Sequence, residues 1–267
     1  MFSVICPTYN SSSFVAKTLD SILNQQFSNY EIILSDDGST DDTLKILEKY
    51  SSLFQEKKIK CTILENEHHG PGYARNRGLE ISEFDWISFI DSDDLWTEDK
   101  LSKVNKCIIE NQKFNCILHR QFHKTKSGKY NKFNFDKYYD PKKPTHRQIF
   151  KSNFLSTSTV TIRKEIILNV GLFNEEYQNA QDYDLWLKIG DNFNIVILKE
   201  YLGTYVSRVG NISSRSYFSR FPNVLKIVNK NKKKVSLILY IYKLIRIFLS
   251  LEWIKLHHFH IKNFFRI

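Results

Sequence analysis

The 267-residue sequence predicts an α/β fold with a mainly parallel central sheet, helices on both faces and a C-terminal amphipathic helical tail. The main observation is that short apolar runs of β-forming residues alternate with segments of helical periodicity through the first half of the chain. This alternation is typical of βαβ units, which build parallel sheets. A hydrophobic content of 42% is also ample for a globular core.

The first half is expected to run strand, helix, strand, helix. Strands are predicted near residues 2–6, 30–35, 59–64 and 85–90, and the helices between them near 13–25, 41–50 and 72–82. Crossovers between parallel strands are right-handed, so the helices cover the faces of the sheet, and ligands bind beyond the carboxyl ends of the strands. The residues that follow each strand are therefore the candidates for a site.

The second half is less regular. A helix near 98–110 and a strand near 115–120 are followed by residues 121–147, which are rich in Lys, Tyr and Phe, lack periodicity and are expected to form an inserted loop. Residues 154–206 predict a strand, a short helix, a helix over 181–190 and a strand near 194–198.

The net charge of +10 is unevenly distributed. Residues 113–151 and 226–267 each carry +9, which leaves the remainder of the chain at −8. A duplex-binding domain would instead line its reading face with basic residues, so we expect no nucleic-acid partner.

The four cysteines lack the close spacing of a zinc site or the density of a disulfide framework, and we expect reduced thiols. No charged segment and long apolar run precede the first strand, as they would in a signal peptide, which predicts a cytoplasmic protein.

An acidic cluster, Asp91-Ser92-Asp93-Asp94, follows the apolar strand that ends at Ile90. Alternate residues of an extended segment point the same way, so Asp91 and Asp93 can face one Mn²⁺ or Mg²⁺ ion, whose preferred ligands are carboxylate oxygens and water. Asp94 is left to bind sugar hydroxyls or the backbone. The alternative interpretation is an acidic first turn that caps the next helix.

Two carboxylates, Asp36 and Asp37, end the second strand before a glycine-permitted turn. Helix capping explains the residues that follow them but not the acid pair itself. A carboxylate here could accept the N3–H of a uracil, and Tyr9 could stack on the base, although packing in the core explains Tyr9 equally well.

Arg75 and Arg77 lie in a glycine-rich turn that leads into a helix, where backbone N–H groups and guanidinium groups meet phosphates. Solvated arginines on a helix are the alternative. The adjacent His68 and His69 have no spaced third ligand and are interpreted as loop residues rather than a metal site.

Sugar transfer to a hydroxyl requires a base that takes the acceptor's proton. Asp182, at the start of the helix over 181–190, is the best candidate for that base, with helix capping as the alternative role. Asp184 lies on another face of the helix and is expected to cap or pair, while Trp186 packs into the core.

Taken in order, these segments resemble glycosyltransferase family 2, the inverting enzymes of the Rossmann-like, nucleotide-binding GT-A fold. The resemblance covers residues 2–205 and rests on Val4-Ile5-Cys6-Pro7-Thr8-Tyr9-Asn10, Ile33-Leu34-Ser35-Asp36-Asp37-Gly38-Ser39, Ala74-Arg75-Asn76, Asp91-Ser92-Asp93-Asp94 and Asp182-Tyr183-Asp184-Leu185-Trp186. One departure is Gln181, where such proteins usually carry Glu.

The resemblance implies a donor site for a nucleotide sugar, with UDP as the expected nucleotide, and inversion at the anomeric carbon by single displacement. The implied donor-binding residues are Pro7, Thr8, Tyr9, Asp36, Asp37, Arg75, Asp91 and Ser92. The implied metal ligands are Asp93 and Asp91, the base is Asp182, and Asp94 is secondary. The acceptor is expected to be a glycan or a lipid-linked glycan of surface polysaccharide synthesis.

The organisation follows from these assignments. Residues 1–220 are predicted to form the catalytic domain, with a nucleotide-sugar half over 1–112 and an acceptor half over 113–220, and residues 221–267 a basic helical tail. The stretch 235–254 is apolar but interrupted by Lys243, Arg246 and Glu252, which favours an interfacial helix over a spanning one.

Through residues 226–262 we expect peripheral binding to the inner face of the cell membrane. The alternative is that the apolar face docks on the catalytic domain or on a second copy of the chain. Two other functions stay open on the sequence. A metal-dependent nucleotidyltransferase could use the same pocket and carboxylates, and a nonenzymatic membrane-surface protein could carry the same tail.

Overall fold

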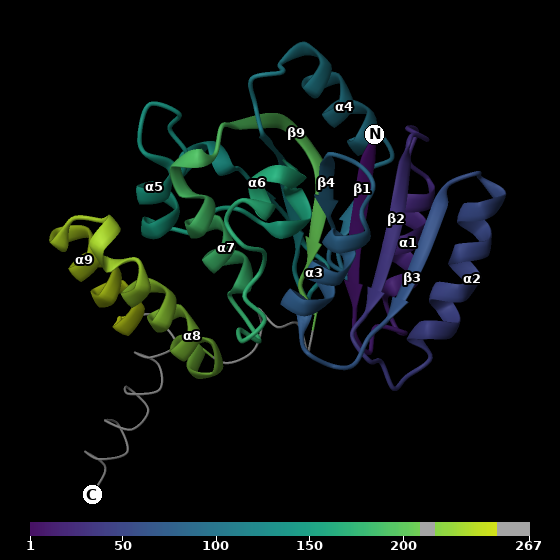
Figure 1. The fold of residues 1–267 in the computed structure, drawn as a ribbon, viewed down its shortest axis with the longest axis horizontal. Helices are drawn as coiled ribbons and strands as arrows, with labels where there is room; N and C mark the ends of the chain where they lie inside the picture. The colour runs from purple at the N-terminus through teal and green to yellow at the C-terminus, as the bar shows by residue number, and fades with distance from the viewer. Residues whose placement is uncertain (209–216, 250–267) are drawn as a thin grey trace, which may run out of the picture.

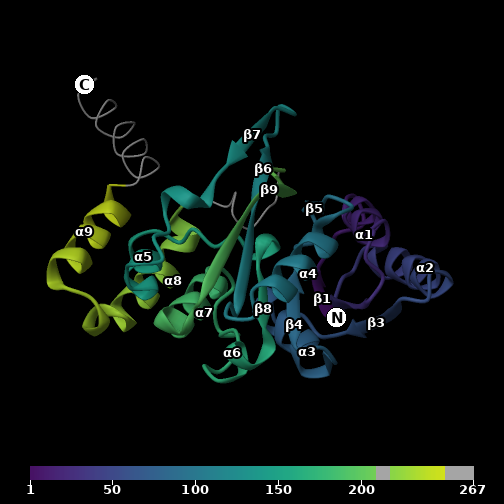
Figure 2. The same cartoon turned by 90° about the horizontal axis from the view of Figure 1, so that it is seen from above.

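The computed structural model describes residues 1–208 and 217–249, and of residues 217–220 only the backbone. Within these residues nine strands form one sheet in the order β3-β2-β1-β4-β8-β6-β9-β5, and β7 pairs with β6 (Figures 1 and 2). The strands are β1 (Phe2–Thr8), β2 (Tyr30–Asp36), β3 (Lys60–Glu65), β4 (Trp86–Phe89), β5 (Leu95–Trp96), β6 (Cys116–Lys124), β7 (Tyr130–Phe133), β8 (Thr161–Arg163) and β9 (Ile195–Val206).

The helices alternate with these strands through the first half, as predicted. They are α1 (Val15–Leu23), α2 (Thr43–Glu56), α3 (Pro71–Ile81), α4 (Lys100–Glu110), α5 (Thr145–Lys151), α6 (Lys164–Leu168), α7 (Gln181–Ile189), α8 (Tyr217–Lys230) and α9 (Leu237–Phe248). Short 3₁₀ turns complete the described chain at η1 (Phe135–Lys137), η2 (Thr157–Thr159), η3 (Gly190–Asn192) and η5 (Lys232–Lys234).

The first four strands of the sheet are parallel and in register. β1 pairs with β2 from Phe2 opposite Tyr30 to Thr8 opposite Asp36, and β3 and β4 extend the sheet on either side. The carboxyl ends of these strands therefore meet at one edge, toward the bottom of Figure 1 for β1.

The second half of the sheet is mixed rather than mainly parallel. β8 pairs antiparallel with both β4 and β6, and β5 pairs antiparallel with β9, whereas β6 and β9 are parallel. This pairing combines segments more than forty residues apart, which local periodicity does not encode.

The expectation of an inserted loop over 121–147 was wrong. β6 continues to Lys124 and forms a hairpin with β7, and the segment then leads through η1 into α5. Aromatic residues of this segment pack the two strands of the hairpin together. The rings of His123 and Phe133, for example, stack with their centroids 4.7 Å apart.

Side chains of the parallel strands alternate between two cores, which confirms helices on both faces. Val4 and Cys6 pack with α1, α2 and α4, whereas Ile5 packs with α3, α7 and their neighbours. α3 lies especially close to β1, because a Cβ atom added at Gly78 would be 2.7 Å from Cγ2 of Ile5. This close approach brings the start of α3 to the carboxyl end of β1.

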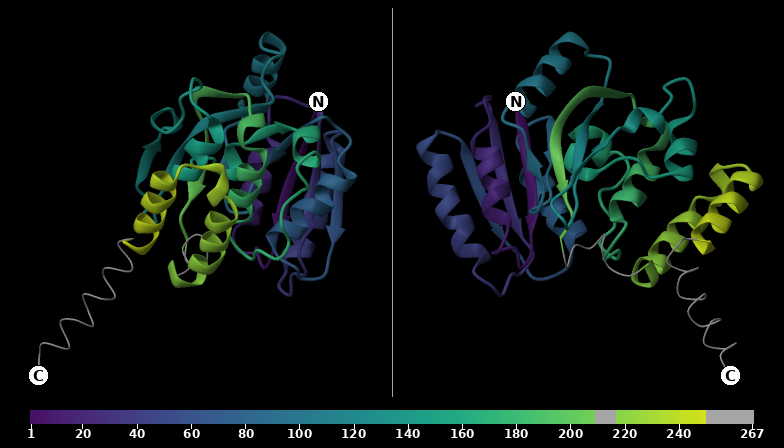
Figure 3. Two further views of the ribbon diagram at one scale, coloured as in Figure 1. Left: turned by 60° about the vertical axis from the view of Figure 1, so that its left-hand side comes forward. Right: turned by 180° about the vertical axis from the view of Figure 1, so that it is seen from behind.

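The C-terminal part of the described chain is a helical hairpin, α8 and α9, beside α5 and α7 (Figure 3). Leu239 and Ile247 of α9 are buried in the same core as α5 and α7. Tyr240 and Leu244 are half-buried, whereas seven further apolar residues of α9 and its C-cap position are exposed, namely Leu237, Ile238, Ile241, Tyr242, Ile245, Phe248 and Leu249. We call these seven residues the outer face of α9.

One side of α9 thus docks on the domain, as the alternative interpretation of the tail expected, while its outer face is exposed apart from local contacts such as that of Phe248 with Phe221. Residues 250–262 of the predicted membrane segment lie outside the described residues. No helix among the described residues is both long enough and apolar enough to span a membrane.

Candidate functional site

A cavity of about 660 Å³ opens at the carboxyl ends of the parallel strands. It brings together ten of the residues and neighbours that the sequence singled out, from five separate segments: Pro7, Thr8, Tyr9, Asp37, His68, Arg75, Asp91, Ser92, Asp93 and Asp182. Asp36 and Asp94 do not line it. We call this space the central cavity.

Asp91 lies on the floor of the central cavity and is held by an arginine. Nη2 of Arg75 lies 2.6 Å from Oδ1 of Asp91. Arg75 is buried, and its Nη1 donates to the carbonyl oxygen of Pro71 in the first turn of α3. Its Nε has no hydrogen-bond partner among the described residues. The arginine therefore keeps donor capacity beside a carboxylate that faces the cavity.

Asp93 faces the same cavity one residue beyond Ser92 and pairs with an arginine from a distant segment. Nε of Arg208 lies 2.9 Å from Oδ2 of Asp93. Burial, followed by the negative charge of Asp91, raises the pKa of Asp93 to about 6, despite the opposing effect of Arg208. The negative charges of Asp91 and Asp93 therefore repel each other, and a cation bound between them would stabilise both carboxylates.

Asp94 points away from the cavity and links three segments. Its carboxylate accepts hydrogen bonds from Oγ of Ser158 at 2.6 Å and from the backbone N–H of Val206 at 3.1 Å. Burial, then Asp93 and Asp91, raises its pKa well above the usual value. Of the two roles proposed for this residue, the contacts match bonding to the backbone.

Asp36 and Asp37 have different surroundings. Asp36 accepts hydrogen bonds from the hydroxyl of Thr8, at 2.8 Å, and from the backbone N–H and hydroxyl of Ser39, so it closes the turn behind the cavity wall. Asp37 lines the cavity, and its carboxylate accepts from the backbone N–H groups of His69 and Gly70. Gly70 can offer its N–H there because it adopts a φ of +98°.

Tyr9 is exposed at the mouth of the central cavity rather than packed in the core. Its ring stacks on that of His68, with centroids 4.0 Å apart and planes 17° from parallel. Nδ1 of His68 lies 2.8 Å from Oδ2 of Asp37, which orients the imidazole. His68 and His69 are loop residues, as expected, but His68 also supports the aromatic surface next to Asp37.

Asp182 also lines the central cavity, from the first turn of α7. Ala180 precedes the helix in the left-handed conformation, with a φ of +58°. The pKa of Asp182 is raised, mainly by burial, while the charges of Arg75 and Asp91 act in opposite directions. Nδ2 of Asn153 lies 3.5 Å from Oδ2 of Asp182. A carboxyl group with a raised pKa is suited to accept a proton near neutral pH.

The neighbours of Asp182 stabilise α7. Asp184 is fully buried and pairs with Lys188 at 3.1 Å and Lys230 of α8 at 3.4 Å, as its expected structural role requires. Trp186 is fully buried in the core, also as expected. Gln181 lines the cavity, and its Oε1 has no hydrogen-bond partner among the described residues.

Sequence reasoning missed several lining residues, notably Asn153, Arg208 and Lys243. Arg208 follows β9 in a segment without a motif and is 115 positions from Asp93. Lys243 interrupts an apolar stretch, which was read as the polar edge of an interfacial helix. Neither residue carries a local signal, because tertiary packing alone brings it to the cavity.

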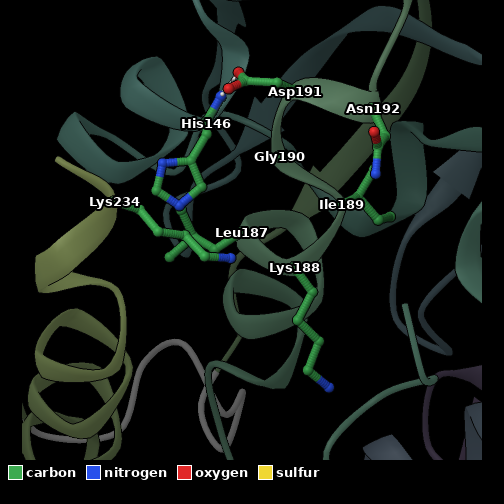
Figure 4. Close-up of a pocket in the computed structure, with 8 residues that line it drawn as sticks. All are labelled: His146, Leu187, Lys188, Ile189, Gly190, Asp191, Asn192 and Lys234. Carbon is green, nitrogen blue, oxygen red and sulfur yellow. Dashed lines mark hydrogen bonds between the residues drawn. The ribbon is translucent and has the colours of Figure 1, made fainter. Parts of the chain in front are cut away.

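A second, smaller cavity of about 300 Å³ lies at the end of α7, between α5 and η5 (Figure 4). The backbone N–H of His146 donates to Oδ1 of Asp191 at 2.9 Å, and the side chains of Lys188 and Lys234 border the opening. None of the residues predicted for the site lies there. The central cavity is therefore the candidate functional site.

Comparisons with known proteins find similar sequences. A family model described as Glycosyl transferase family 2 matches residues 3–171. The amylovoran biosynthesis glycosyltransferase AmsB of Erwinia amylovora is 32% identical over 79% of this chain and 71% of that protein. The UDP-Glc:alpha-D-GlcNAc-diphosphoundecaprenol beta-1,3-glucosyltransferase WfgD of Escherichia coli is 29% identical over 73% of this chain and 72% of that protein.

Solved structures share the fold. TarS 1-349 of S. aureus in complex with UDP-GlcNAc superposes with a TM-score of 0.71 and 27% identity, over 94% of this chain and 73% of that one. The mannosyltransferase PcManGT of Pyrobaculum calidifontis, in complex with GDP-Man and Mn²⁺, superposes over 93% of this chain and 70% of that one. Its TM-score is 0.67 and its identity 17%, and it supports the fold alone.

Proposed function

The chain belongs to glycosyl transferase family 2 and is a glycosyltransferase of the GT-A fold, and we propose that it moves a sugar from a UDP-sugar to a hydroxyl of an acceptor. The proposed acceptor is a glycan or a lipid-linked glycan of surface polysaccharide synthesis. The observation that carries the proposal is that the pair Asp91 and Asp93 and the more distant residue Asp182 line one cavity. The relatives named above supply the class of donor and acceptor.

On the donor side, Pro7, Thr8, Tyr9 and Asp37 form the wall proposed for the nucleoside. The exposed ring of Tyr9 offers an aromatic surface for the base, and the carboxylate of Asp37, which lines the same cavity, is proposed to accept the N3–H of a uracil. Asp36 acts indirectly by holding Thr8 and the turn. Arg75, with its unpartnered Nε, is proposed to lie next to the donor.

We propose that Asp91 and Asp93, with Ser92 between them, hold a Mn²⁺ or Mg²⁺ ion together with the donor diphosphate. The residues fit such an ion, because two carboxylates plus substrate phosphates and water are the usual ligands of Mg²⁺ in transferases. The described residues contain no group of three or more metal-ligating side chains, so the donor would complete the coordination. When bound, the cation would neutralise the leaving diphosphate.

For the transfer itself, Asp182 is proposed as the general base. The acceptor hydroxyl oxygen forms a bond to the anomeric carbon, the bond from that carbon to the diphosphate oxygen breaks, and Asp182 takes the hydroxyl proton. Attack from the face opposite the leaving group inverts the anomeric configuration in one displacement. Asn153 is proposed to orient the carboxylate of Asp182, because its side-chain amide can donate a hydrogen bond to Oδ2 of Asp182.

The direct test is release of UDP by the purified full chain with Mn²⁺, a panel of UDP-sugars and lipid-linked acceptors. We expect acceptor-dependent release of UDP with at least one donor, and loss of that release when a chelator removes the metal. Release of pyrophosphate would instead indicate nucleotidyl transfer and would contradict the proposed sugar transfer. Turnover that a chelator does not inhibit would contradict the proposed role of the metal.

We propose that residues 1–112 form the donor half, residues 113–220 the acceptor half, and residues 221–267 the tail. In support, the donor wall comes from strand ends before residue 112 and Asp182 from the later half. The tail is proposed to bind the inner face of the cell membrane through residues 226–262. The outer face of α9 and the lysines of η5 are the described features that support this binding.

Membrane binding predicts that the chain floats with vesicles that contain phosphatidylglycerol. The double variant Ile238→Ser/Ile241→Ser should bind at least about tenfold more weakly, because each exposed side chain buries apolar area in the interface. Ile109→Ser/Leu168→Ser removes two exposed apolar side chains elsewhere and is the matched control. Equal flotation of the two double variants would rule out the outer face of α9 as the membrane contact.

A further inference from the structure

Three basic residues lie near one another where α9 packs on α5, beside the central cavity, and of the three Lys243 lines the cavity. Its Nζ lies 5.0 Å from the centre of the Tyr183 ring. Lys151 and Arg246 approach the ring of Tyr242 at 6.0 Å and 5.8 Å. Nζ of Lys243 also donates to the carbonyl oxygen of Lys151 at 3.4 Å. We call Lys151, Lys243 and Arg246 the basic rim.

No carboxylate of the described chain forms an ion pair with the basic rim. Burial, followed by repulsion from Arg246, lowers the pKa of Lys243 to about 8. A buried ammonium beside a like charge is unfavourable on its own, and an anion bound between the two would stabilise both. The arrangement is thus typical of an anion site rather than of a structural ion pair.

The position of the basic rim separates it from the donor diphosphate. The donor carboxylates and Arg75 follow β4 and open α3, whereas Lys243 contacts Tyr183, the residue next to Asp182. Lys243, Tyr183 and Asp182 all line the cavity, so an anion at Lys243 would share the cavity with the proposed base. A phosphate ester, with several charged acceptor oxygens, is the ligand that a Lys and Arg cluster binds best.

We propose that the basic rim is a phosphate subsite for the acceptor, so that the acceptor sugar is recognised together with the phosphate ester attached to it. This inference rests on the proposed glycosyl transfer. Two sources share this chemistry: a lipid-linked sugar with a diphosphate, and a polymer with phosphodiester repeats. The outer face of α9 begins on the same helix as Lys243, which favours the lipid-linked source, because its chain can continue along that face.

The test is a binding titration with the full chain saturated with UDP and Mn²⁺, so that the donor site is filled. The probes are octyl diphosphate, the phosphodiester methyl octyl phosphate, and neutral octyl glucoside. We expect the wild type to bind octyl diphosphate, and Lys243→Gln to weaken this binding by about tenfold or more, the effect of one charge-assisted hydrogen bond. Octyl glucoside should bind both proteins equally.

Two further variants separate a binding role from a structural one. Lys243→Arg keeps the charge and should restore octyl diphosphate binding. Lys226→Gln removes an exposed lysine of α8 that does not line the cavity and should bind like the wild type. Tighter binding of octyl diphosphate than of the phosphodiester supports a lipid-linked source, and the reverse order supports a polymer.

The outcomes distinguish this inference from the proposed function. A wild type that binds UDP but not octyl diphosphate, or a Lys243→Gln variant that binds it unchanged, would overturn the phosphate subsite and leave glycosyl transfer standing. If the wild type neither binds UDP nor releases UDP from any UDP-sugar, the proposed glycosyl transfer itself would be contradicted.

Discussion

Replacement of Asp182 by asparagine is expected to lower the rate of sugar transfer by about 10²–10⁴-fold, the usual contribution of a general base. The amide keeps the shape and the hydrogen-bonding reach of the side chain but cannot take the acceptor's proton. Donor binding should persist, because Asp182 is proposed to contact the acceptor hydroxyl rather than the donor. The measurements are kcat for UDP release with acceptor, and the Kd of UDP by titration.

The pH dependence of the wild type should identify the same carboxyl group. Because burial raises the pKa of Asp182, the acidic limb of the pH–rate profile should lie above the ordinary value of 3.8, with activity lost as the carboxylate is protonated. Glu176→Gln removes an exposed carboxylate from the segment before α7 and should leave kcat and the profile unchanged. Full activity in Asp182→Asn would refute the assignment.

Protein stability provides a check on folding. The folded state binds the Asp182 proton more tightly than the unfolded state, so the free energy of unfolding falls as pH rises from 3.8 through the raised pKa. Asparagine removes this cost. At pH 7 the variant should therefore unfold thermally at the same temperature as the wild type or a higher one, and a loss of activity would not reflect misfolding.

Asp93→Asn is expected to reduce transfer by about 10²–10³-fold, since a metal-held diphosphate is worth several kcal/mol in the transition state. The substitution also weakens the pair with Arg208, so donor binding and catalysis should fall together. The measurement is kcat/KM for the donor as a function of Mn²⁺ concentration, where the variant should require far more metal.

The matched control for Asp93 is Asp99→Asn, which removes a carboxylate six residues along the chain that pairs with Lys103 and does not line the cavity. It should leave the Mn²⁺ dependence unchanged. If the Asp93 variant kept the wild-type dependence on Mn²⁺, the metal would have other ligands and the role of Asp93 would be limited to its pair with Arg208.

Sequence reasoning selected the edge of the sheet where the central cavity lies but did not separate neighbouring carboxylates. Asp36 ends β2 and Asp37 follows it directly, yet Asp36 bonds Thr8 and Ser39 while Asp37 lines the cavity. The same holds for Asp93 and Asp94, of which only the first lines the cavity. Which of two adjacent side chains faces a cavity depends on the backbone conformation of the turn that follows the strand. The same residues are compatible with several turn conformations, so the sequence alone does not decide between the two side chains.

By itself the sequence determined the parallel half of the sheet and the edge where the central cavity lies, and it selected Asp91, Asp93 and Asp182 as candidate site residues. These features follow from local periodicity and from residue types at strand and helix ends, which need no distant partner. Only the tertiary structure decided the antiparallel half, the pairing of Arg208 with Asp93, and the place of Lys243 in the cavity wall. Those contacts join segments far apart in the chain, and packing free energy rather than local pattern selects them.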